Sequence, residues 1–275
     1  MRKTILVIIA AIVAIGAVVG GIVLHRVTYL SYPEGKDHID YRDVPDNILL
    51  REVSIPASAT YIARYSFYFC ESLRKVHMHE GMEQIGARAF AGCRGLREIE
   101  LPSTVWYIGA GAFRFCDNLQ KVTMPPELDS IRHNTFAYCF KLHEFTMPDS
   151  VTYIGTSAFD MCAELNNIEL PSTLEYIGES AFFDCASLDS IIIPQKVRVL
   201  RHMTFGNCTN LQHITLLGRL DTIHPMAFHK CDKLQEIRIP KGTKWHYRRV
   251  LDRNNLSQYK DLLREQKTIH RRPLR

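Results

Sequence analysis

The chain repeats itself every 23 residues. Eight cysteines stand at this constant spacing: Cys70, Cys93, Cys116, Cys139, Cys162, Cys185, Cys208 and Cys231. A phenylalanine stands three residues before each cysteine: Phe67, Phe90, Phe113, Phe136, Phe159, Phe182, Phe205 and Phe228. A repeat of this length predicts a solenoid, in which each unit forms one coil and the stacking of coils buries a continuous core.

Each unit also carries apolar residues two apart, such as Ile99 and Leu101, and a proline often follows, as at Pro102. This period-2 pattern predicts a strand, and successive copies are expected side by side in a parallel sheet, about 4.8 Å apart. The Ala-Phe-x-x-Cys stretch is expected to form a short helical turn on the return side. The predicted fold class is therefore α/β, with a curved parallel sheet.

Residues before the first complete unit fit the same pattern in a degenerate form. Stepping back by one period gives Ile39, Val44, Asn47, Leu50, Val53 and Ile55. Asn47 stands where the other units have cysteine, and terminal repeats are usually atypical because one side faces water. Including this coil, we expect about nine strands.

The unit LxxIxLPxxVxxIGxxAFxxC resembles the BspA-type leucine-rich repeats of bacterial surface proteins. The segments Glu100–Leu119 and Glu169–Leu188 are near-ideal copies, and the resemblance covers about residues 44–240. It implies a leucine-rich repeat solenoid and a role in adhesion or host-protein binding. It also implies that Ile239–Leu251 is the capping segment, with a helix after Pro240. We expect local changes of the turn where the unit's glycine is replaced by a larger residue, at Arg132, Arg201 and His224.

The N-terminus contains twenty residues without a charge, Ile5–Leu24. Twenty helical residues span about 30 Å, the thickness of a bilayer core. Because Arg2 and Lys3 precede this run, we expect a signal anchor that contacts the membrane through residues 5–24, with the repeats outside the cytoplasm. The alternative is a cleaved signal peptide and a secreted protein.

Four segments follow from these patterns. They are a transmembrane segment (1–26), a linker with a degenerate cap (27–48), the repeats (49–240) and a basic capping helix with a tail (241–275). The last segment holds eleven Lys or Arg and three Asp or Glu. Its charge suits contact with phosphates or lipid headgroups, or simply a solvated surface. We expect no nucleic-acid partner.

The cysteines are interpreted as architecture. An even number of cysteines outside the cell often indicates disulfides. Equivalent residues of stacked coils, however, have parallel side chains whose Cβ atoms stay about 5 Å apart, against about 3.8 Å in a disulfide. We therefore expect a reduced, buried cysteine ladder beside the phenylalanine ladder. No Cys-x-x-Cys pair occurs, so no zinc site and no cofactor are expected.

Signatures of catalysis are missing from the sequence. It contains no Gly-rich phosphate loop, no GxSxG and no HExxH. Glu100 and Glu169 stand on the strand face three coils apart, about 14 Å, which is too far for a glycosidase pair. We expect no enzyme.

Candidate ligand contacts lie on two registers of the surface. The central register of the strand face contains His77, Glu100, Glu169 and Arg238. Trp106 occupies a register whose equivalents are charged or polar, and Tyr107, Tyr153 and Tyr176 share the next one. Exposed Trp and Tyr are favoured interface anchors. The alternatives are aromatic packing across coils and an ordinary solvated sheet.

The expected function is a membrane-anchored binding module at the cell surface, which takes a protein or glycan ligand. An envelope-associated scaffold without a specific host ligand is the alternative. A degenerate enzyme or inhibitor is the third and least favoured hypothesis.

Overall fold

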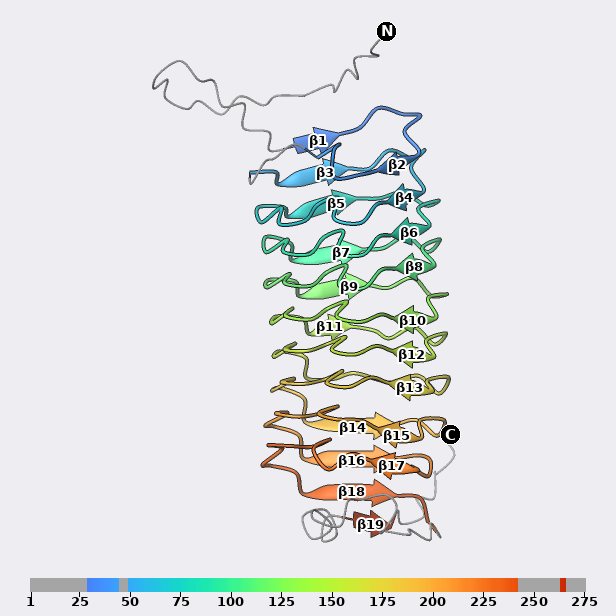
Figure 1. The fold of residues 1–275 in the computed structure, drawn as a ribbon, viewed down its shortest axis with the longest axis vertical. Coiled ribbons are helices and arrows are strands. Elements are labelled where there is room, and N and C mark those ends of the chain that lie inside the picture. Colours follow the sequence, from blue (N-terminus) through green and yellow to red (C-terminus); the bar gives the residue numbers. More distant parts are fainter. Residues whose placement is uncertain (1–28, 45–48, 242–262, 266–275) are drawn as a thin grey trace, which may run out of the picture.

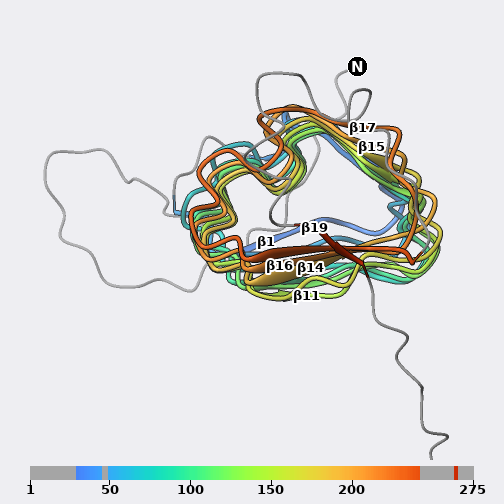
Figure 2. The same cartoon turned by 90° about the horizontal axis from the view of Figure 1, so that it is seen from below.

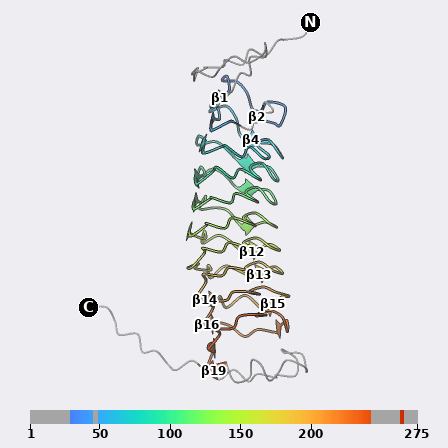
Figure 3. The same ribbon diagram turned by 90° about the vertical axis from the view of Figure 1, so that its left-hand side faces the viewer.

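Each 23-residue unit forms one coil of a β-solenoid. The computed structural model describes residues 29–44, 49–241 and 263–265. In Figures 1 and 3 the coils stack in a nearly straight column, with the N-terminal coil at one end and β19 at the other. The expected solenoid is confirmed.

One face of the column is formed by the predicted strands of the Leu-x-x-Ile-x-Leu segment. Two further strands, β1 and β19, extend this row at its ends. The strands are β1 (Tyr29–Ser31), β3 (Glu52–Ser54), β5 (Lys75–His77), β7 (Glu98–Glu100), β9 (Lys121–Thr123), β11 (Glu144–Phe145), β14 (Ser190–Ile193), β16 (His213–Leu216), β18 (Glu236–Ile239) and β19 (Leu263–Glu265).

A second row of short strands forms another face, which the sequence reasoning missed. Each strand ends on a buried Ile or Leu, which in all but β2 precedes the core phenylalanine by five residues. They are β2 (His38–Ile39), β4 (Tyr61–Ile62), β6 (Gln84–Ile85), β8 (Tyr107–Ile108), β10 (Ser130–Ile131), β12 (Tyr153–Ile154), β13 (Tyr176–Ile177), β15 (Val199–Leu200) and β17 (Thr222–Ile223). Figure 2 shows β1, β11, β14 and β16 along one side of the coil, with β15 and β17 on another.

All strand pairs in the described residues are parallel, and the repeat sets their register. Tyr153 pairs with Tyr176 and Ile154 with Ile177, a displacement of one unit. The last pair departs from this rule, because Ile237 of β18 faces Leu263 of β19. The final strand therefore pairs at a displacement of 26 residues and not of one 23-residue unit.

The expected helical turns are wrong: the described residues contain no helix, and the fold is a β-solenoid rather than α/β. The corner around Phe159 shows why. Ser157 and Met161 have positive φ angles, 53° and 60°, which interrupt any right-handed helix. The N–H of Phe159 donates to Ala181 O in the next coil (2.8 Å), whereas that of Cys162 donates back to Phe159 O (3.2 Å).

A curved sheet was expected, but the column is nearly straight. The corner around Phe159 explains this difference as well. A helix is about 10 Å wide, twice the spacing of strands, so helices on one side splay the coils apart. Here extended or turn backbone stacks on every side, and neighbouring coils are hydrogen-bonded at the corner as well as in the sheets. The spacing is therefore similar all round the coil.

One expected strand is absent from the described part of the chain. The sixth complete unit adds no strand to the first row between β11 and β14, although Ile168 is buried there like its equivalents. Asn166 and Asn167 occupy the start of this segment. Asparagine is depleted in strands, which accounts for the local loss of pairing.

The predicted end segments fall largely outside the described residues. None of the described segments forms a helix with the length and apolar character needed to span a bilayer, and residues 5–24 lie outside them. Asn47 of the degenerate coil lies outside as well. Of the predicted capping helix, only 241 and 263–265 are described, and the latter three form strand β19 instead of helix.

The core is a column of stacked phenylalanine rings. The eight phenylalanines of the repeat, from Phe67 to Phe228, are buried, and neighbouring rings lie 5.1 to 5.9 Å apart between centroids. Their planes are within 20° of parallel. Isoleucine and leucine side chains from both strand rows surround this column, which makes the core continuous along the stack.

Candidate ligand-binding surface

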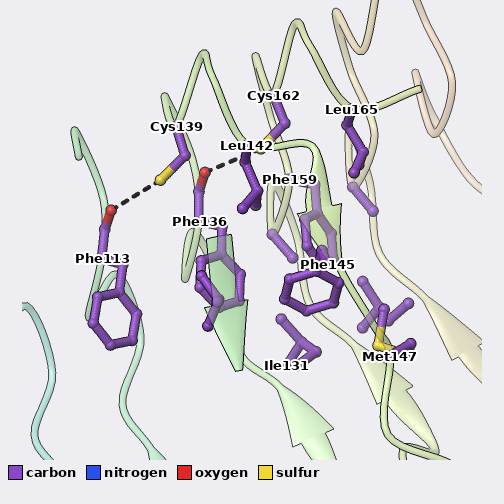
Figure 4. Packing of buried hydrophobic residues seen from close by; sticks show 14 of the residues in the cluster. Phe113, Ile131, Phe136, Cys139, Leu142, Phe145, Met147, Phe159, Cys162 and Leu165 are labelled. Atoms are coloured by element: carbon purple, nitrogen blue, oxygen red, sulfur yellow. Dashed lines mark hydrogen bonds between the residues drawn. The ribbon is translucent and has the colours of Figure 1, made fainter. Parts of the chain in front are cut away.

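The cysteines lie in the core and bond to the backbone. In Figure 4 the Sγ of Cys139 points at Phe113 O (3.2 Å), and that of Cys162 at Phe136 O (3.3 Å). Cys93, Cys116, Cys185, Cys208 and Cys231 donate in the same way to the phenylalanine carbonyl of the preceding coil. The structure contains them as free, buried thiols.

Burial makes these thiols unreactive. It raises the pKa of Cys70 to about 11 and that of Cys231 to about 12, and these two lie at the ends of the ladder. It raises the pKa of Cys185, deeper in the column, well above the usual value. Since the thiolate is the nucleophile and the metal ligand, the ladder is suited to neither role.

Residues with catalytic or metal-binding chemistry are dispersed. The described residues contain no group of three His, Cys, Asp or Glu side chains placed to hold a metal. The rings of His202 and His224 meet edge to face at 5.0 Å. Glu100 and Glu169 are both exposed, on separate coils.

The four strand-face candidates are spread along the column and are not brought together. The Nε2 of His77 lies 2.7 Å from Glu52 Oε1. The Nε of Arg238 lies 2.9 Å from Glu236 Oε2, near the opposite end of the stack. These are short polar contacts between exposed side chains, and such contacts contribute little to stability.

The neighbouring register of this face carries charges of alternating sign. Its residues in successive coils are Glu52, Lys75, Glu98, Lys121 and Glu144. Lys121 Nζ lies 3.3 Å from Glu144 Oε2, and Glu98 is its register partner on the other side. Opposite charges across strands favour the observed register, so this row has a sufficient structural explanation.

The tyrosines on the second face form a half-buried ladder with two arginines. Tyr153 and Tyr176 stack at 4.7 Å with planes 12° apart. Arg201 caps this pair, with its Cζ 3.9 Å from the Tyr176 ring centre, and Arg132 lies 4.6 Å from the ring of Tyr107. Packing across coils, the alternative left open by the sequence, is therefore present for Tyr153 and Tyr176.

Trp106 differs from these tyrosines because its side chain is free of such a stack. It is 53% exposed and meets only the edge of Tyr107, at 5.9 Å. The backbone N–H of Trp106 donates to Glu83 O of the preceding coil (3.1 Å), and this bond holds the backbone beneath the side chain in place. Trp106 thus presents a large aromatic surface on a firmly held coil.

A second group of exposed aromatic residues was missed. Tyr68, Phe69 and Phe140 are 37 to 46% exposed at the corner next to the cysteine ladder. Nearby, the Arg114 guanidinium lies 4.5 Å from the Phe115 ring centre. Each of these residues lies next to a repeated phenylalanine or cysteine, in a register whose residue type varies from unit to unit. The same kind of variation identified Trp106 in the sequence.

The repeats of this chain are similar to those of a known family. The family described as BspA type leucine rich repeat region matches residues 46–165 and 129–257, most of the chain. Among the curated proteins, none matches the sequence.

Three solved structures are similar to the chain. A leucine-rich cell surface protein from Faecalibacterium prausnitzii is 22% identical, covers 82% of each chain and has a TM-score of 0.46. A leucine-rich repeat protein from Bacteroides ovatus is 16% identical over 88% of this chain and 95% of its own, with a TM-score of 0.48. The leucine-rich repeat protein of T. pallidum is 24% identical over 87% and 85%, with a TM-score of 0.44. On the family match over residues 46–257, the chain belongs to the BspA-type leucine-rich repeat family of bacterial surface proteins.

Proposed function

We propose that this protein is a binding module displayed at the cell surface. In this proposal residues 5–24 anchor it in the membrane and the solenoid lies outside, where it recognises a protein or glycan ligand. Membership of a family of bacterial surface repeats supports this location. Catalysis is not part of the proposal, since such repeats are typically binding modules.

The exposure of Trp106 is the observation that carries the proposed binding role. A tryptophan that is 53% exposed keeps a large apolar surface in water, and burying it against a partner is favourable. The coil beneath is held by hydrogen bonds to its neighbours, so little conformational freedom is lost on binding. Tyr107, with Arg132 over its ring, extends this contact surface on one side.

Location is tested first, by protease treatment of intact cells that produce the full chain, with detection of the Arg238 end. Loss of the signal supports exposure of the solenoid outside. Protection contradicts it and favours the envelope scaffold.

Binding is then tested with the full chain in neutral detergent against immobilised fibronectin, collagen and mucin. Trp106→Ala is expected to weaken binding to whichever of these the protein recognises by about tenfold, because a central aromatic anchor contributes on that scale. Ile192→Ala is the matched control, since Ile192 is 55% exposed on the other strand row. Equal effects of the two substitutions, or binding to none of the three, would contradict the proposal.

A further inference from the structure

Three arginines stand in one row at the start of three successive strands. Arg51, Arg74 and Arg97 occupy the same register and directly precede the segments of β3, β5 and β7. The N–H of Arg74 donates to Arg51 O at 2.7 Å, so their backbones are immediate neighbours. With about 4.8 Å per coil, the row extends over about 10 Å along the solenoid axis. All three residues are exposed.

The row has no ion pair within the described residues. None of the three guanidinium groups forms a salt bridge there, whereas Glu52, Glu71 and Asp117 beside the row contact other side chains. His77 pairs with Glu52, and Arg94 pairs with both Glu71 and Asp117. Like charges on neighbouring strands are unfavourable, so this row costs stability unless something neutralises it.

The row is also local to one end of the column. The same register continues as Gln120, His143, Asn166, Asp189, Gln212 and Gln235. The adjacent register, by contrast, alternates in sign along the same coils, with Glu52, Lys75 and Glu98 in succession. The sheet therefore does not require three positive charges in sequence, and a ligand is the better explanation.

We propose that Arg51, Arg74 and Arg97 form a binding site for a linear anionic polysaccharide that bears carboxylate or sulfate groups and lies along the solenoid axis. A guanidinium group presents a planar fork of donors that matches such oxyanions. Three of them at a fixed spacing suit a polymer with regularly repeated charges.

The geometry favours a polysaccharide over an acidic peptide. A peptide that adds to a sheet pairs with the backbone of an edge strand, but this row runs across the strands, where backbone groups are already paired. Two residues before Arg74 and Arg97 stand Ser72 and Gly95, which are small, whereas Leu49 holds this place before Arg51. Two of the three arginines thus have small neighbours that leave room for a polymer with hydroxyl groups.

This site lies on a different face from Trp106 and does not rest on the proposed function. Trp106 directly precedes β8 in the second strand row, whereas the arginines precede strands of the first row. Trp106→Ala is therefore expected to leave polysaccharide binding unchanged, and loss of the arginines is expected to leave binding through Trp106 unchanged.

The test measures binding of the full chain, in neutral detergent, to dextran sulfate and to polygalacturonate, with neutral dextran and poly-L-glutamate as comparisons. The triple variant Arg51→Gln, Arg74→Gln and Arg97→Gln is expected to lose at least about tenfold in affinity at low salt, with a weaker dependence on salt. The matched control is Lys196→Gln, Arg198→Gln and Lys233→Gln, which removes the same charge from residues that already have polar partners. It is expected to lose less than about twofold.

Three results would overturn the proposal. The first is no binding of the unmodified protein to either anionic polysaccharide. The second is an equal loss in both triple variants, which would show a general effect of net charge. The third is binding to poly-L-glutamate in preference to both polysaccharides, which would assign the row to an acidic peptide.

Discussion

The backbone N–H of Arg201 donates a hydrogen bond to Oγ1 of Thr204 at 2.9 Å. Four of the eight complete coils have glycine and alanine at these two positions, as in Gly178 and Ala181. There the glycine N–H donates to the preceding coil instead, as Gly178 N does to Ile154 O (2.8 Å). In the Arg201 coil the corresponding carbonyl, Ile177 O, accepts from the arginine's own Nη1 at 3.0 Å.

A Cβ atom at Gly178 would lie 2.4 Å from the backbone N of Thr156, so this coil has no room for a side chain unless it moves. A side chain at this position does not by itself cause the exchange, because Ala63 and His224 still donate to Ile39 O (2.7 Å) and Leu200 O (2.8 Å) of the preceding coil. We infer that the exchange follows from the pairing of arginine with threonine, since Oγ1 of Thr204 offers the Arg201 N–H an acceptor within its own coil. The pair Arg132 and Thr135 carries the same two residue types, with Thr135 Oγ1 donating to Arg132 O at 2.8 Å.

The first prediction concerns the Thr204 hydroxyl. Thr204→Ala is expected to lower the free energy of unfolding by about 1–2 kcal/mol, because a buried N–H loses its acceptor. The double variant Arg201→Gly with Thr204→Ala restores the common pair and is expected to recover most of this loss. Urea unfolding followed by circular dichroism measures both. Additive losses in the double variant would show that the two positions are independent.

The second prediction concerns close approach of the coils. Gly178→Ala is expected to lower the free energy of unfolding by about 2–3 kcal/mol, because its new methyl group meets backbone and not a flexible side chain. Gly111→Asn is the matched control: Gly111 has φ 65°, and its equivalent Asn134 adopts φ 57°. This control is expected to change stability by less than about 0.5 kcal/mol. A similar loss in both variants would contradict the steric explanation.

The repeat made the coil, its core and one strand row predictable. Phe90 and Cys93 recur in phase, and an unbroken apolar period identifies buried positions without any alignment. The second strand row was not predictable in the same way, because a strand such as β12 has only two residues, too few to show a period of two.

The corner and the surface depend on neighbours in space that a single coil does not reveal. The positive φ of Ser157 belongs to a residue type that is ordinary in helices and turns alike, so the pattern suggested a helix. The stacking of Arg201 on Tyr176 joins residues that are 25 apart in the sequence and lie in neighbouring units. Trp106 is exposed, as its polar equivalents indicate, and its contact with a ligand stays a prediction.

The third prediction concerns the cysteine ladder. Dithiothreitol is expected to leave the melting temperature unchanged, and iodoacetamide at pH 8 is expected to leave the native thiols unmodified, because burial raises their pKa. Cys139→Ala is expected to cost about 1–2 kcal/mol, through the lost bond to Phe113 O and the space left behind. Cys139→Ser keeps a donor at this position and serves as the comparison. A lower melting temperature under reducing conditions would show that disulfides form.

The last prediction concerns Asp160, a half-buried carboxyl group beside the core. Burial is the largest cause that raises the pKa of Asp160; with Arg114 lowering it and nearby Asp184 raising it, the pKa is about 6. Because the folded protein holds this proton more tightly than the unfolded chain, stability from this group is complete below about pH 4 and is lost as the pH rises to about 6. The shift corresponds to about 3 kcal/mol at most, and solvent screening of a half-exposed group reduces it to about 1 kcal/mol.

Asp160→Asn removes the titration while keeping the shape of the side chain. The variant is therefore expected to be more stable than the unmodified protein by about 1 kcal/mol at pH 7.5, with the difference disappearing near pH 4. Thermal unfolding at pH 4, 5, 6 and 7.5 measures the change, and Asp129→Asn, which alters an exposed carboxylate, is the control. A constant difference across these pH values would exclude Asp160 as the titrating group, since a packing effect alone does not vary with pH.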